Sequence, residues 1–457
     1  MIWMPRVLVA AVLTTVAIAA PQTQTPGDAP QPPQQPNEIV TTITSAGVGV
    51  APRFAVPDFI AVTKDAETVD TAHAIAQVLY DDLDFEREFA LIPRDVYVTV
   101  PAATSVFNVP LDRWLELNAD GVIVGTVQKI GTGVRVEVRL LNVRSRQSVF
   151  AREYTGSIAS ARMYAHTIAD ELHQSQRGLR GVARTKLTFN SDRDGEQIGG
   201  TVQNRGVKEI YISDYDGANQ RRVTVQRSLN IMSTWSVDAR SIAYVSYRRG
   251  LPQIFISNIY EGTLEELTKN AGNNMTPMWS PDGTRLAFAS TMDGAGNTEI
   301  YVINRDGTNL RRLTNHPGAD VTPTWSPSGT QIAFVSDRTG PPQIYAMSPE
   351  GLSLQRLTTE KSDRPTWSPP PYNEIAYAAS TGPGFDIRIL DLATREVKQL
   401  TFGEGTNESP SFSPNGRHIA FMSTRAGKAQ IFTLSRTGQD LKQITRTGNN
   451  YQPHWSR

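Results

Sequence analysis

The sequence predicts a two-domain protein of the α+β class, in which a small mixed α/β domain precedes a six-bladed β-propeller. Two observations lead to this prediction. A tryptophan-serine pair recurs with a period in the forties, and short apolar strands lie between successive pairs. The long segment before these repeats lacks the pattern altogether. A period of this length, with several strands in each unit, is typical of a propeller blade, so we expect the preceding segment to fold separately.

The first 20 residues predict a cleavable secretory signal. Arg6 is followed by an apolar run over residues 7–20, and Ala17 and Ala19 supply the small-residue pattern of a cleavage site near Ala19. The run is shorter than the roughly 20 residues that a membrane-spanning helix requires. We therefore expect an exported protein without direct membrane insertion.

Composition narrows the expected partners and chemistry. Lys+Arg and Asp+Glu are balanced at 45 each, so no overall charge favours binding to nucleic acid. We expect the protein to be a monomer. The chain has no cysteine, which excludes disulfides and thiolate chemistry. Residues 21–37 contain six prolines and five glutamines and almost nothing apolar, so they predict an extended linker.

Residues 38–183 predict the mixed α/β domain. Two helices are expected from apolar residues spaced four apart, one over 68–89 and one over 158–176. Their apolar faces carry Ile75, Leu79 and Leu83 in the first helix and Tyr164, Ile168 and Leu172 in the second. Strands are expected within residues 47–59 and over 120–130, 134–138 and 148–154.

Residues 184–457 predict the propeller. The recurring pairs are spaced 42 to 46 residues apart, and they are Trp235-Ser236, Trp279-Ser280, Trp325-Ser326, Trp367-Ser368, Phe412-Ser413 and Trp455-Ser456. Each of the first five pairs precedes a Pro-Asp-Gly-like turn, an apolar strand, a third strand and a fourth strand that ends near a Leu-Thr pair. The first unit lacks its tryptophan strand, and the chain ends on a tryptophan strand without a blade. We expect these two fragments to pair and close the ring, which removes exposed sheet edges. A linear β-solenoid is the alternative.

No pattern in the sequence predicts catalysis or a cofactor. The nucleophile elbow, the zinc-protease helix, the phosphate loop and the dinucleotide fingerprint are missing. His166, Asp170 and His173 share one helical face with the spacing of metal ligands, but a polar helix face is the favoured interpretation. Residues 192–195 and 214–217 are similar to the start of a calcium loop, and hairpin turns explain them better.

The positions four residues before each recurring aromatic are candidates for a binding surface. Four of these six residues are apolar or aromatic, although we expect loops around the channel rim there; the six are Ile231, Met275, Val321, Asp363, Glu408 and Tyr451. Neighbouring polar residues are expected to form the rim of an interface, namely Asn274, Asp320, Arg364, Asn407 and Asn450. The alternative is that the six side chains point inward and anchor the loops.

The repeat Trp-Ser-Pro-Asp-Gly, Leu-Ala-Phe, Ile-Tyr, Asp-Gly and Leu-Thr resembles the propeller repeat of the TolB family. Other exported propellers share this repeat. Stretches outside it resemble the same family: ADGVIVGTV (119–127), YAHTIADEL (164–172), GLRGVARTKLTF (178–189) and SDYDGANQ (213–220). Together they extend the resemblance over residues 38–457 and make it more specific than the repeat alone.

The resemblance implies a non-enzymatic periplasmic adaptor of the Tol-Pal system, which supports envelope integrity and cell division. One propeller face would bind the peptidoglycan-associated lipoprotein Pal, and the matching positions are Asn273, Asn274, Met275, Asp320, Val321 and Thr322. A segment opening the mature chain would bind the inner-membrane protein TolA. The segment that matches it is 38–50, with Glu38, Ile39, Val40 and Ile43 as candidate contacts.

An enzymatic propeller is the alternative from another class. Peptidases of the prolyl-oligopeptidase type carry similar repeats, and lactonases and phytases use six-bladed channels, usually with a metal. The peptidase version needs a hydrolase domain besides the propeller. The other versions need carboxylates or histidines that converge on the channel. A calcium or zinc ion held in the channel, together with hydrolytic turnover, would favour this alternative.

Overall fold

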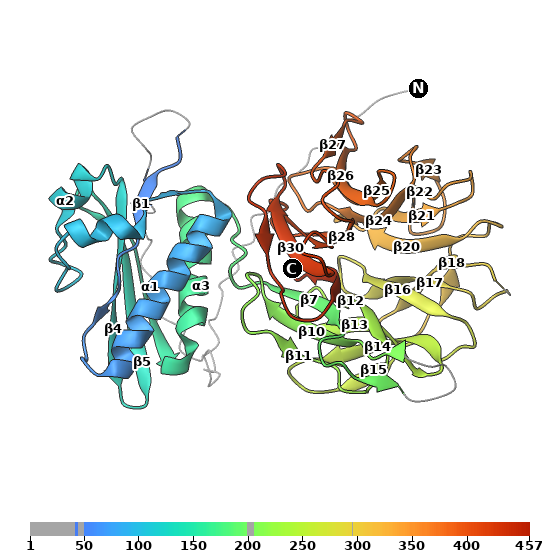
Figure 1. Ribbon diagram of the computed structural model, residues 1–457, viewed down its shortest axis with the longest axis horizontal. Helices are drawn as coiled ribbons and strands as arrows, with labels where there is room; N and C mark the ends of the chain where they lie inside the picture. The colour runs from blue at the N-terminus through green and yellow to red at the C-terminus, as the bar shows by residue number, and fades with distance from the viewer. Residues whose placement is uncertain (1–41, 44–49, 199–204, 295) are drawn as a thin grey trace, which may run out of the picture. The chain divides into compact units, whose positions relative to one another are not determined.

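The computed structural model describes residues 42–43, 50–198, 205–294 and 296–457. The predicted signal peptide and the Pro/Gln-rich linker lie outside these residues. The described chain consists of a mixed α/β domain followed by a six-bladed β-propeller (Figure 1). The predicted fold class is therefore confirmed.

The N-terminal domain has one mixed sheet with the strand order β3-β1-β4-β5-β6, and β2 pairs with β4 beside this path. β1, β2 and β3 are parallel to their partners, while β4, β5 and β6 form an antiparallel meander. The elements are β1 (Arg53–Ala55), β2 (Ile60–Ala61), α1 (Ala66–Glu86), β3 (Ala90–Leu91), η1 (Arg94–Thr99), α2 (Leu111–Glu116), β4 (Gly121–Ile130), β5 (Gly133–Asn142), β6 (Ser148–Ser157), η2 (Ile158–Ser160) and α3 (Ala161–Arg177).

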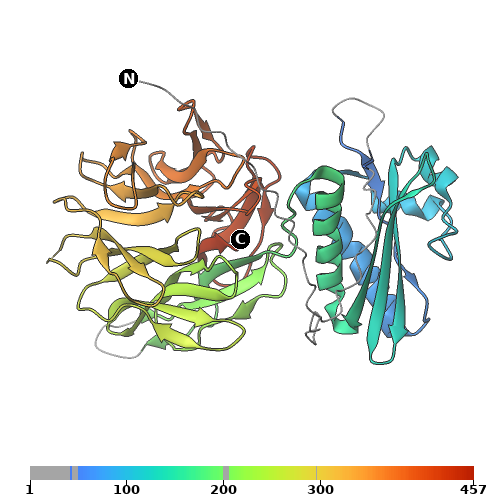
Figure 2. The same cartoon turned by 180° about the vertical axis from the view of Figure 1, so that it is seen from behind.

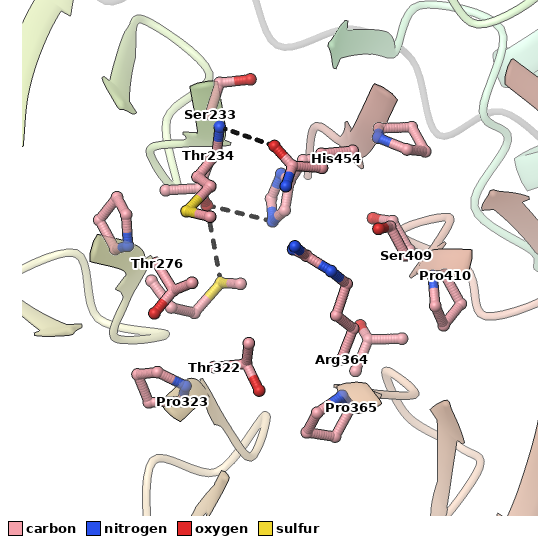
Figure 3. Close-up of a pocket in the computed structure, with 17 residues that line it drawn as sticks. Ser233, Thr234, Thr276, Thr322, Pro323, Arg364, Pro365, Ser409, Pro410 and His454 are labelled. Atoms are coloured by element: carbon pink, nitrogen blue, oxygen red, sulfur yellow. Dashed lines mark hydrogen bonds between the residues drawn. The ribbon is translucent and has the colours of Figure 1, made fainter. Parts of the chain in front are cut away.

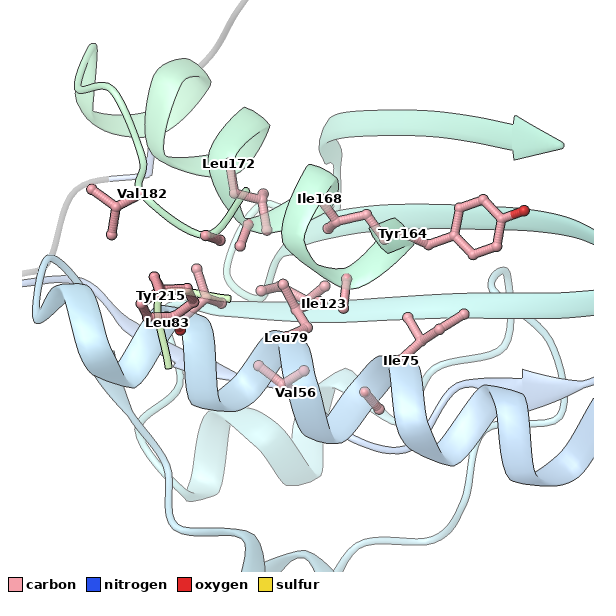
Figure 4. Packing of buried hydrophobic residues seen from close by; sticks show 14 of the residues in the cluster. Val56, Ile75, Leu79, Leu83, Ile123, Tyr164, Ile168, Leu172, Val182 and Tyr215 are labelled. Atoms are coloured by element: carbon pink, nitrogen blue, oxygen red, sulfur yellow. The ribbon is translucent and has the colours of Figure 1, made fainter. Parts of the chain in front are cut away.

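Helices α1 and α3 pack together over one face of this sheet (Figure 4). Figure 2 shows α3 running alongside the long strands. The predicted apolar faces are confirmed, because all six of their residues are buried; they are Ile75, Leu79, Leu83, Tyr164, Ile168 and Leu172. Helix α1 begins earlier than predicted because Asp65 caps it by accepting the Thr68 N–H, and it ends earlier because Arg87 is left-handed.

Alternation along β4 separates two cores. Ile123 faces α1 and α3, whereas Val122 and Val124 face a second cluster around Trp114 of α2. Both faces of the sheet are therefore covered, which explains why β4 is an almost continuous apolar run.

The propeller consists of six four-stranded sheets, each running from the channel outward. Blade 1 contains β32 (Asn450–Trp455), β7 (Lys186–Ser191), β10 (Glu209–Asp214) and β11 (Arg221–Arg222). Blades 2 and 3 contain β12 (Asn230–Trp235), β13 (Ser241–Arg249), β14 (Leu251–Asn258), β15 (Leu264–Glu266), β16 (Asn274–Trp279), β17 (Arg285–Ser290), β18 (Glu299–Asn304) and β19 (Arg311–Arg312).

Blades 4 to 6 repeat the same order of strands. They contain β20 (Asp320–Trp325), β21 (Ile332–Ser336), β22 (Gln343–Met347), β23 (Gln355–Arg356), β24 (Ser362–Trp367), β25 (Glu374–Ser380), β26 (Phe385–Asp391), β27 (Val397–Gln399), β28 (Asn407–Phe412), β29 (His418–Ser423), β30 (Gln430–Ser435) and β31 (Lys442–Gln443). A small hairpin in blade 1, β8 (Gln197–Ile198) with β9 (Arg205–Gly206), was not predicted.

The C-terminal strand closes the ring as predicted. β32 pairs antiparallel with β7, with Trp455 opposite Leu187 and His454 opposite Thr188. The Trp455 indole is buried and donates its Nε1 proton to Thr185 Oγ1 at 2.7 Å. Because the pairing joins the two ends of the propeller sequence into one blade, the solenoid alternative is excluded.

The recurring Leu-Thr pair has a structural explanation. In every blade the threonine hydroxyl accepts the backbone N–H of the isoleucine in the third strand, at 2.8–2.9 Å. The six threonines are Thr224, Thr268, Thr314, Thr358, Thr401 and Thr445. The short fourth strand is thus held by a buried side chain as well as by its few ladder bonds.

The two calcium-like stretches are turns, as expected. Gly195 donates its N–H to the Asp192 carbonyl, and Gly217 donates to the Asp214 carbonyl, both at 3.0 Å. Both glycines have positive φ, 64° and 90°, which explains the Asp-x-Asp-Gly pattern without an ion.

Candidate binding site at the propeller channel

Each innermost strand of the propeller contains a β-bulge at the same place. The ladder register shifts between the second and fifth residues of every one of these strands. The third residue has a φ of 50–57° in all six, which is rare outside glycine; these residues are Met232, Thr276, Thr322, Arg364, Ser409 and Gln452. A bulge redirects side chains, and here it turns one residue from each blade into the channel.

These six residues line a central channel cavity of about 90 Å³ (Figure 3). The rest of its lining consists mostly of proline rings and hydroxyl groups, with His454 on one side. We call this space the channel cavity; its other lining residues are Ser233, Thr234, Pro277, Met278, Pro323, Pro365, Thr366, Pro410, Ser411, Pro453 and His454.

His454 has a fixed orientation in the channel cavity. Its Nδ1 accepts the Trp235 backbone N–H at 3.3 Å, and its Nε2 lies 3.2 Å from the Thr234 hydroxyl. Burial, with a smaller contribution from the charge of Arg457, lowers the pKa of His454 to about 3. The imidazole is therefore neutral at neutral pH.

A neutral histidine in the folded state predicts sensitivity to acid. The unfolded chain takes up a proton near pH 6.5 and the folded chain does not, so the free energy of unfolding falls as the pH drops below 6.5. Between pH 6.5 and 5 this contribution is at most about 2 kcal/mol, since each pH unit corresponds to about 1.4 kcal/mol, and solvation of the ring from the channel lowers it further. Urea unfolding should show that His454→Thr, which copies the equivalent residue of blades 2, 4 and 5, loses less stability over this range. Equal losses in both proteins would contradict the assignment.

One mouth of the channel is a cleft of about 200 Å³ that contains four of the predicted site residues. Ile231, Glu408 and Tyr451 line it together with Arg364, which also lines the channel cavity. Lys208 Nζ lies 3.7 Å from the centre of the Tyr451 ring. We call this cleft the channel mouth; its remaining lining residues are Asn190, Leu229, Ser409, Met422 and Gln452.

The placement of the candidate positions in loops was wrong. Ile231, Met275, Val321, Asp363, Glu408 and Tyr451 are each the second residue of an innermost strand and are half-buried. The strands start earlier than the apolar pattern indicates because the bulge interrupts the alternation of side chains. Val321 also packs against the cores of two neighbouring blades, as the alternative interpretation expected of these side chains.

The predicted polar rim was also wrong for four of its five residues. Asn274, Asp320, Asn407 and Asn450 are fully buried and bind other polar side chains within the propeller. Asn274 donates to Gln253 of the preceding blade at 2.9 Å, and Asp320 pairs with Arg338 at 2.8 Å. The Asn274 contact links two neighbouring blades, and the Asp320 contact lies within one blade. Both satisfy polar groups that would be costly to bury unpaired. Arg364, Asn273 and Thr322 are half-buried and keep a surface toward solvent or the channel.

Only part of the predicted N-terminal segment lies within the described residues. Glu38, Ile39 and Val40 lie outside them. Ile43 is buried in the core of the N-terminal domain, and its backbone N–H donates to Gln176 Oε1 of α3 at 3.0 Å.

The three residues with metal-ligand spacing on α3 are all buried, not a solvated face. His166 Nδ1 lies 2.8 Å from Asp82 Oδ2, and His173 Nδ1 bonds the Ala169 carbonyl. Asp170 accepts the Ala183 N–H at 2.9 Å and pairs with Arg184. Within the part of the chain that the structure describes, no group of three or more His, Cys, Asp or Glu side chains is placed to hold a metal ion. Over the same residues, no helix combines the length and the apolar character that crossing a membrane requires.

Sequence reasoning included Thr322 and Arg364 among the candidate site residues but missed the six positive-φ residues as one set, here called the channel ring, and it missed the buried carboxylates of α1. The channel ring leaves one sequence signal, because five of its six residues precede a proline, as in Thr276-Pro277 and Arg364-Pro365. Proline has no N–H for the ladder and is found in sheets at bulges or edges, so a proline inside a repeated strand indicates a bulge. Asp82 and Glu86 leave no such signal, since their partners lie far away in the sequence.

Comparison with known proteins agrees with this architecture. A model of the TolB beta propeller domain matches residues 177–457, and a model of the TolB amino-terminal domain matches residues 41–149. "Tol-Pal system protein TolB" of Desulfosudis oleivorans is 36% identical over 197 residues, covering 43% of this chain and 42% of that protein. The protein of the same name from Geobacter sulfurreducens is 37% identical over 182 residues, covering 39% and 38%.

The sequence matches thus span less than half the length of these curated relatives. The crystal structure of TolB from Acinetobacter baumannii has the same fold, with a TM-score of 0.75 and 24% identity over 89% of this chain and 97% of that one. Since the propeller model alone matches more than half of the sequence, and the amino-terminal model matches most of the domain before it, the chain belongs to the TolB family.

Proposed function

We propose that this protein is a non-enzymatic periplasmic adaptor of the Tol-Pal system. Its propeller binds a Pal-type lipoprotein through the face that carries the channel mouth, and its N-terminal segment binds a TolA-type inner-membrane protein. The observation that carries the proposal is the joint match of both TolB domain models on one chain, together with relatives named Tol-Pal system proteins.

The chemistry of the channel mouth supports a protein partner. Ile231 and Tyr451 give apolar and aromatic surface, while Lys208 and Glu408 give charges of both signs around it. Aromatic anchors surrounded by polar groups are typical of protein interfaces. Met275 and Val321 occupy the equivalent strand positions in blades 3 and 4, so the same face offers further apolar side chains.

Calorimetry between residues 21–457 and the periplasmic domain of the same organism's Pal-type lipoprotein tests the first half of the proposal. We expect a one-to-one complex that Met275→Lys weakens at least tenfold, about 1.4 kcal/mol, by placing an unpaired charge in the interface. Met163→Lys is the matched control, because Met163 is exposed on α3, outside the propeller, and should leave the affinity unchanged.

The outcomes separate the two partners. No heat at tens of micromolar protein would exclude the lipoprotein as the partner of this chain. A second titration with the periplasmic domain of the TolA-type protein should give binding that Met275→Lys does not change, because that contact is assigned to residues 38–50. Absence of this second signal would remove the TolA half of the proposal and leave the first half standing.

A further inference from the structure

Arg364 is the one permanently charged side chain in the described lining of the channel cavity. The other residues around it are hydroxyls, prolines, two methionines, a glutamine and the neutral His454. Figure 3 shows the Arg364 side chain extending inward among Thr276, Thr322 and His454. The guanidinium is thus held in a small polar space instead of being exposed on the outer surface.

The guanidinium of Arg364 is poorly neutralised. Within the described chain, the only carboxylate within 4 Å of it belongs to Asp363, whose Oδ2 lies 3.8 Å from Nε, too far for a hydrogen bond. The Arg364 side chain is 25% exposed, so water replaces only part of the missing partner. Its backbone has a φ of 50°, a conformation that costs a non-glycine residue about 1 kcal/mol.

Two hydroxyls beside it lack partners. Thr276 Oγ1 and Thr322 Oγ1 are buried in the lining of the same channel cavity, and neither has a hydrogen-bond partner in the described structure. Leaving a buried hydroxyl unsatisfied costs about 1–3 kcal/mol, so such groups need an explanation. Both threonines also have positive φ, which is unusual for β-branched residues. Neither hydroxyl oxygen has surface open to the channel cavity, so each threonine must rotate about χ1 to turn its hydroxyl toward a ligand held by Arg364.

We propose that the channel cavity binds a small oxyanion, a carboxylate or a phosphate, through the Arg364 guanidinium and the Thr276 and Thr322 hydroxyls. Guanidinium forms charge-assisted, often bidentate bonds with such groups. Hydroxyl groups complete the set as neutral donors, and the low dielectric of the channel strengthens the interaction. The channel cavity of about 90 Å³ has room for the head group of such an anion but not for a larger ligand.

The oxyanion has two possible sources. It is either a free anion, or a carboxylate side chain of the lipoprotein that enters through the channel mouth, which Arg364 also lines. The second source rests on the proposed function, whereas the first does not. Binding to the isolated chain tests the site without any partner.

The first experiment measures the unfolding midpoint and the calorimetric affinity of the full chain for sodium phosphate and sodium acetate. Sodium chloride at equal ionic strength is the reference. We expect saturating phosphate to raise the Tm by about 2–4 °C by mass action. Arg364→Gln should lower the anion affinity at least tenfold. Arg446→Gln, which changes an exposed arginine, should behave as the wild type.

Thr322→Val gives a second variant in case Arg364→Gln disturbs folding. Because it removes an unsatisfied hydroxyl, it should keep or raise the Tm in chloride while weakening anion binding. A Tm rise of equal size in wild type, Arg364→Gln and Thr322→Val would be a general salt effect and would overturn the proposal.

The second experiment identifies the source. If the lipoprotein supplies the carboxylate, phosphate should weaken its complex with the wild-type chain but not with Arg364→Gln. If the ligand is a free anion, phosphate should leave the complex as strong as in chloride. Loss of anion binding in the first experiment would refute the site even where the lipoprotein binds, and failure of the lipoprotein to bind would leave the site intact.

Discussion

Replacing Asp82 with leucine is expected to destabilise the protein by about 3–5 kcal/mol, because it removes the nearest carboxylate from the buried His166 and leaves the buried Tyr215 hydroxyl without a partner. Asp82 on α1 is buried and accepts the Tyr215 hydroxyl at 2.7 Å through Oδ1. Its Oδ2 pairs with His166 Nδ1 at 2.8 Å. Helix α1, helix α3 and the first blade of the propeller meet at this one carboxylate.

The pH dependence of stability gives this prediction a specific signature. Burial favours the neutral imidazole, but the carboxylate of Asp214, 3.8 Å from Nε2, and that of Asp82, 2.8 Å from Nδ1, outweigh it and raise the pKa of His166 to about 9. The stabilisation that protonated His166 gives the folded state is therefore complete below pH 6.5 and is lost as the pH rises through 9. A shift of this size corresponds to about 3 kcal/mol, and the His166 side chain is only 7% exposed.

Denaturant unfolding at pH 6.5 and pH 9.5 tests both statements. The wild type should lose stability over this range, and Asp82→Leu should start lower and lose much less. Asp81→Leu is the matched control, since Asp81 is the exposed neighbour on the same helix and should change stability by less than about 0.5 kcal/mol. If the two variants are equally stable, Asp82 does not hold the domains together.

The following turn of α1 extends the contact to the last blade. The Val182 N–H and the Asn415 amide both donate to Glu86, and Arg417 donates to its backbone carbonyl at 2.7 Å. Phe85 stacks on His418 with ring centres 4.3 Å apart. Tyr215 belongs to blade 1. Asn415, Arg417 and His418 belong to blade 6, the first two in the turn between β28 and β29 and the third in β29. The N-terminal domain therefore packs on blade 1, which contains the ring closure, and on the neighbouring blade 6.

The sequence predicted features that repeat or alternate locally. The recurring Trp-Ser pair, the apolar faces of α1 and α3, and the closure by β32 follow from periodicity and from counting incomplete units. The contacts of Asp82 and Glu86 could not be predicted, because each depends on a partner more than 80 residues away. The site prediction failed for a different reason: the bulge hides where each innermost strand begins, so Asn274 and Asp320 were expected at a loop rim although both are buried strand residues.

Closure of the propeller ring depends on Trp455 in β32. Trp455→Ala is expected to lower the free energy of unfolding by about 3–5 kcal/mol. Trp455 is 2% exposed, lies opposite Leu187 in the closing strand pair, and packs in the cluster that extends from blade 6 into the N-terminal domain. Its indole N–H donates to the Thr185 hydroxyl, so truncation leaves a cavity and also removes this buried hydrogen bond. β32 has only six residues to hold the ring closed. Loss of the Trp455 side chain should therefore also loosen β32 and expose the edge of β7.

Thermal and urea unfolding of Trp455→Ala and Trp367→Ala separate closure from ordinary packing. Trp367 occupies the equivalent position in blade 5, but it is half-buried and its indole N–H has no partner in the described structure. Its removal should cost about 1–2 kcal/mol. Faster amide exchange in β7 should accompany Trp455→Ala alone, because only that variant opens the ends of the ring. Equal losses, with β7 protected in both variants, would mean that closure rests on the backbone ladder of β32 and not on its tryptophan.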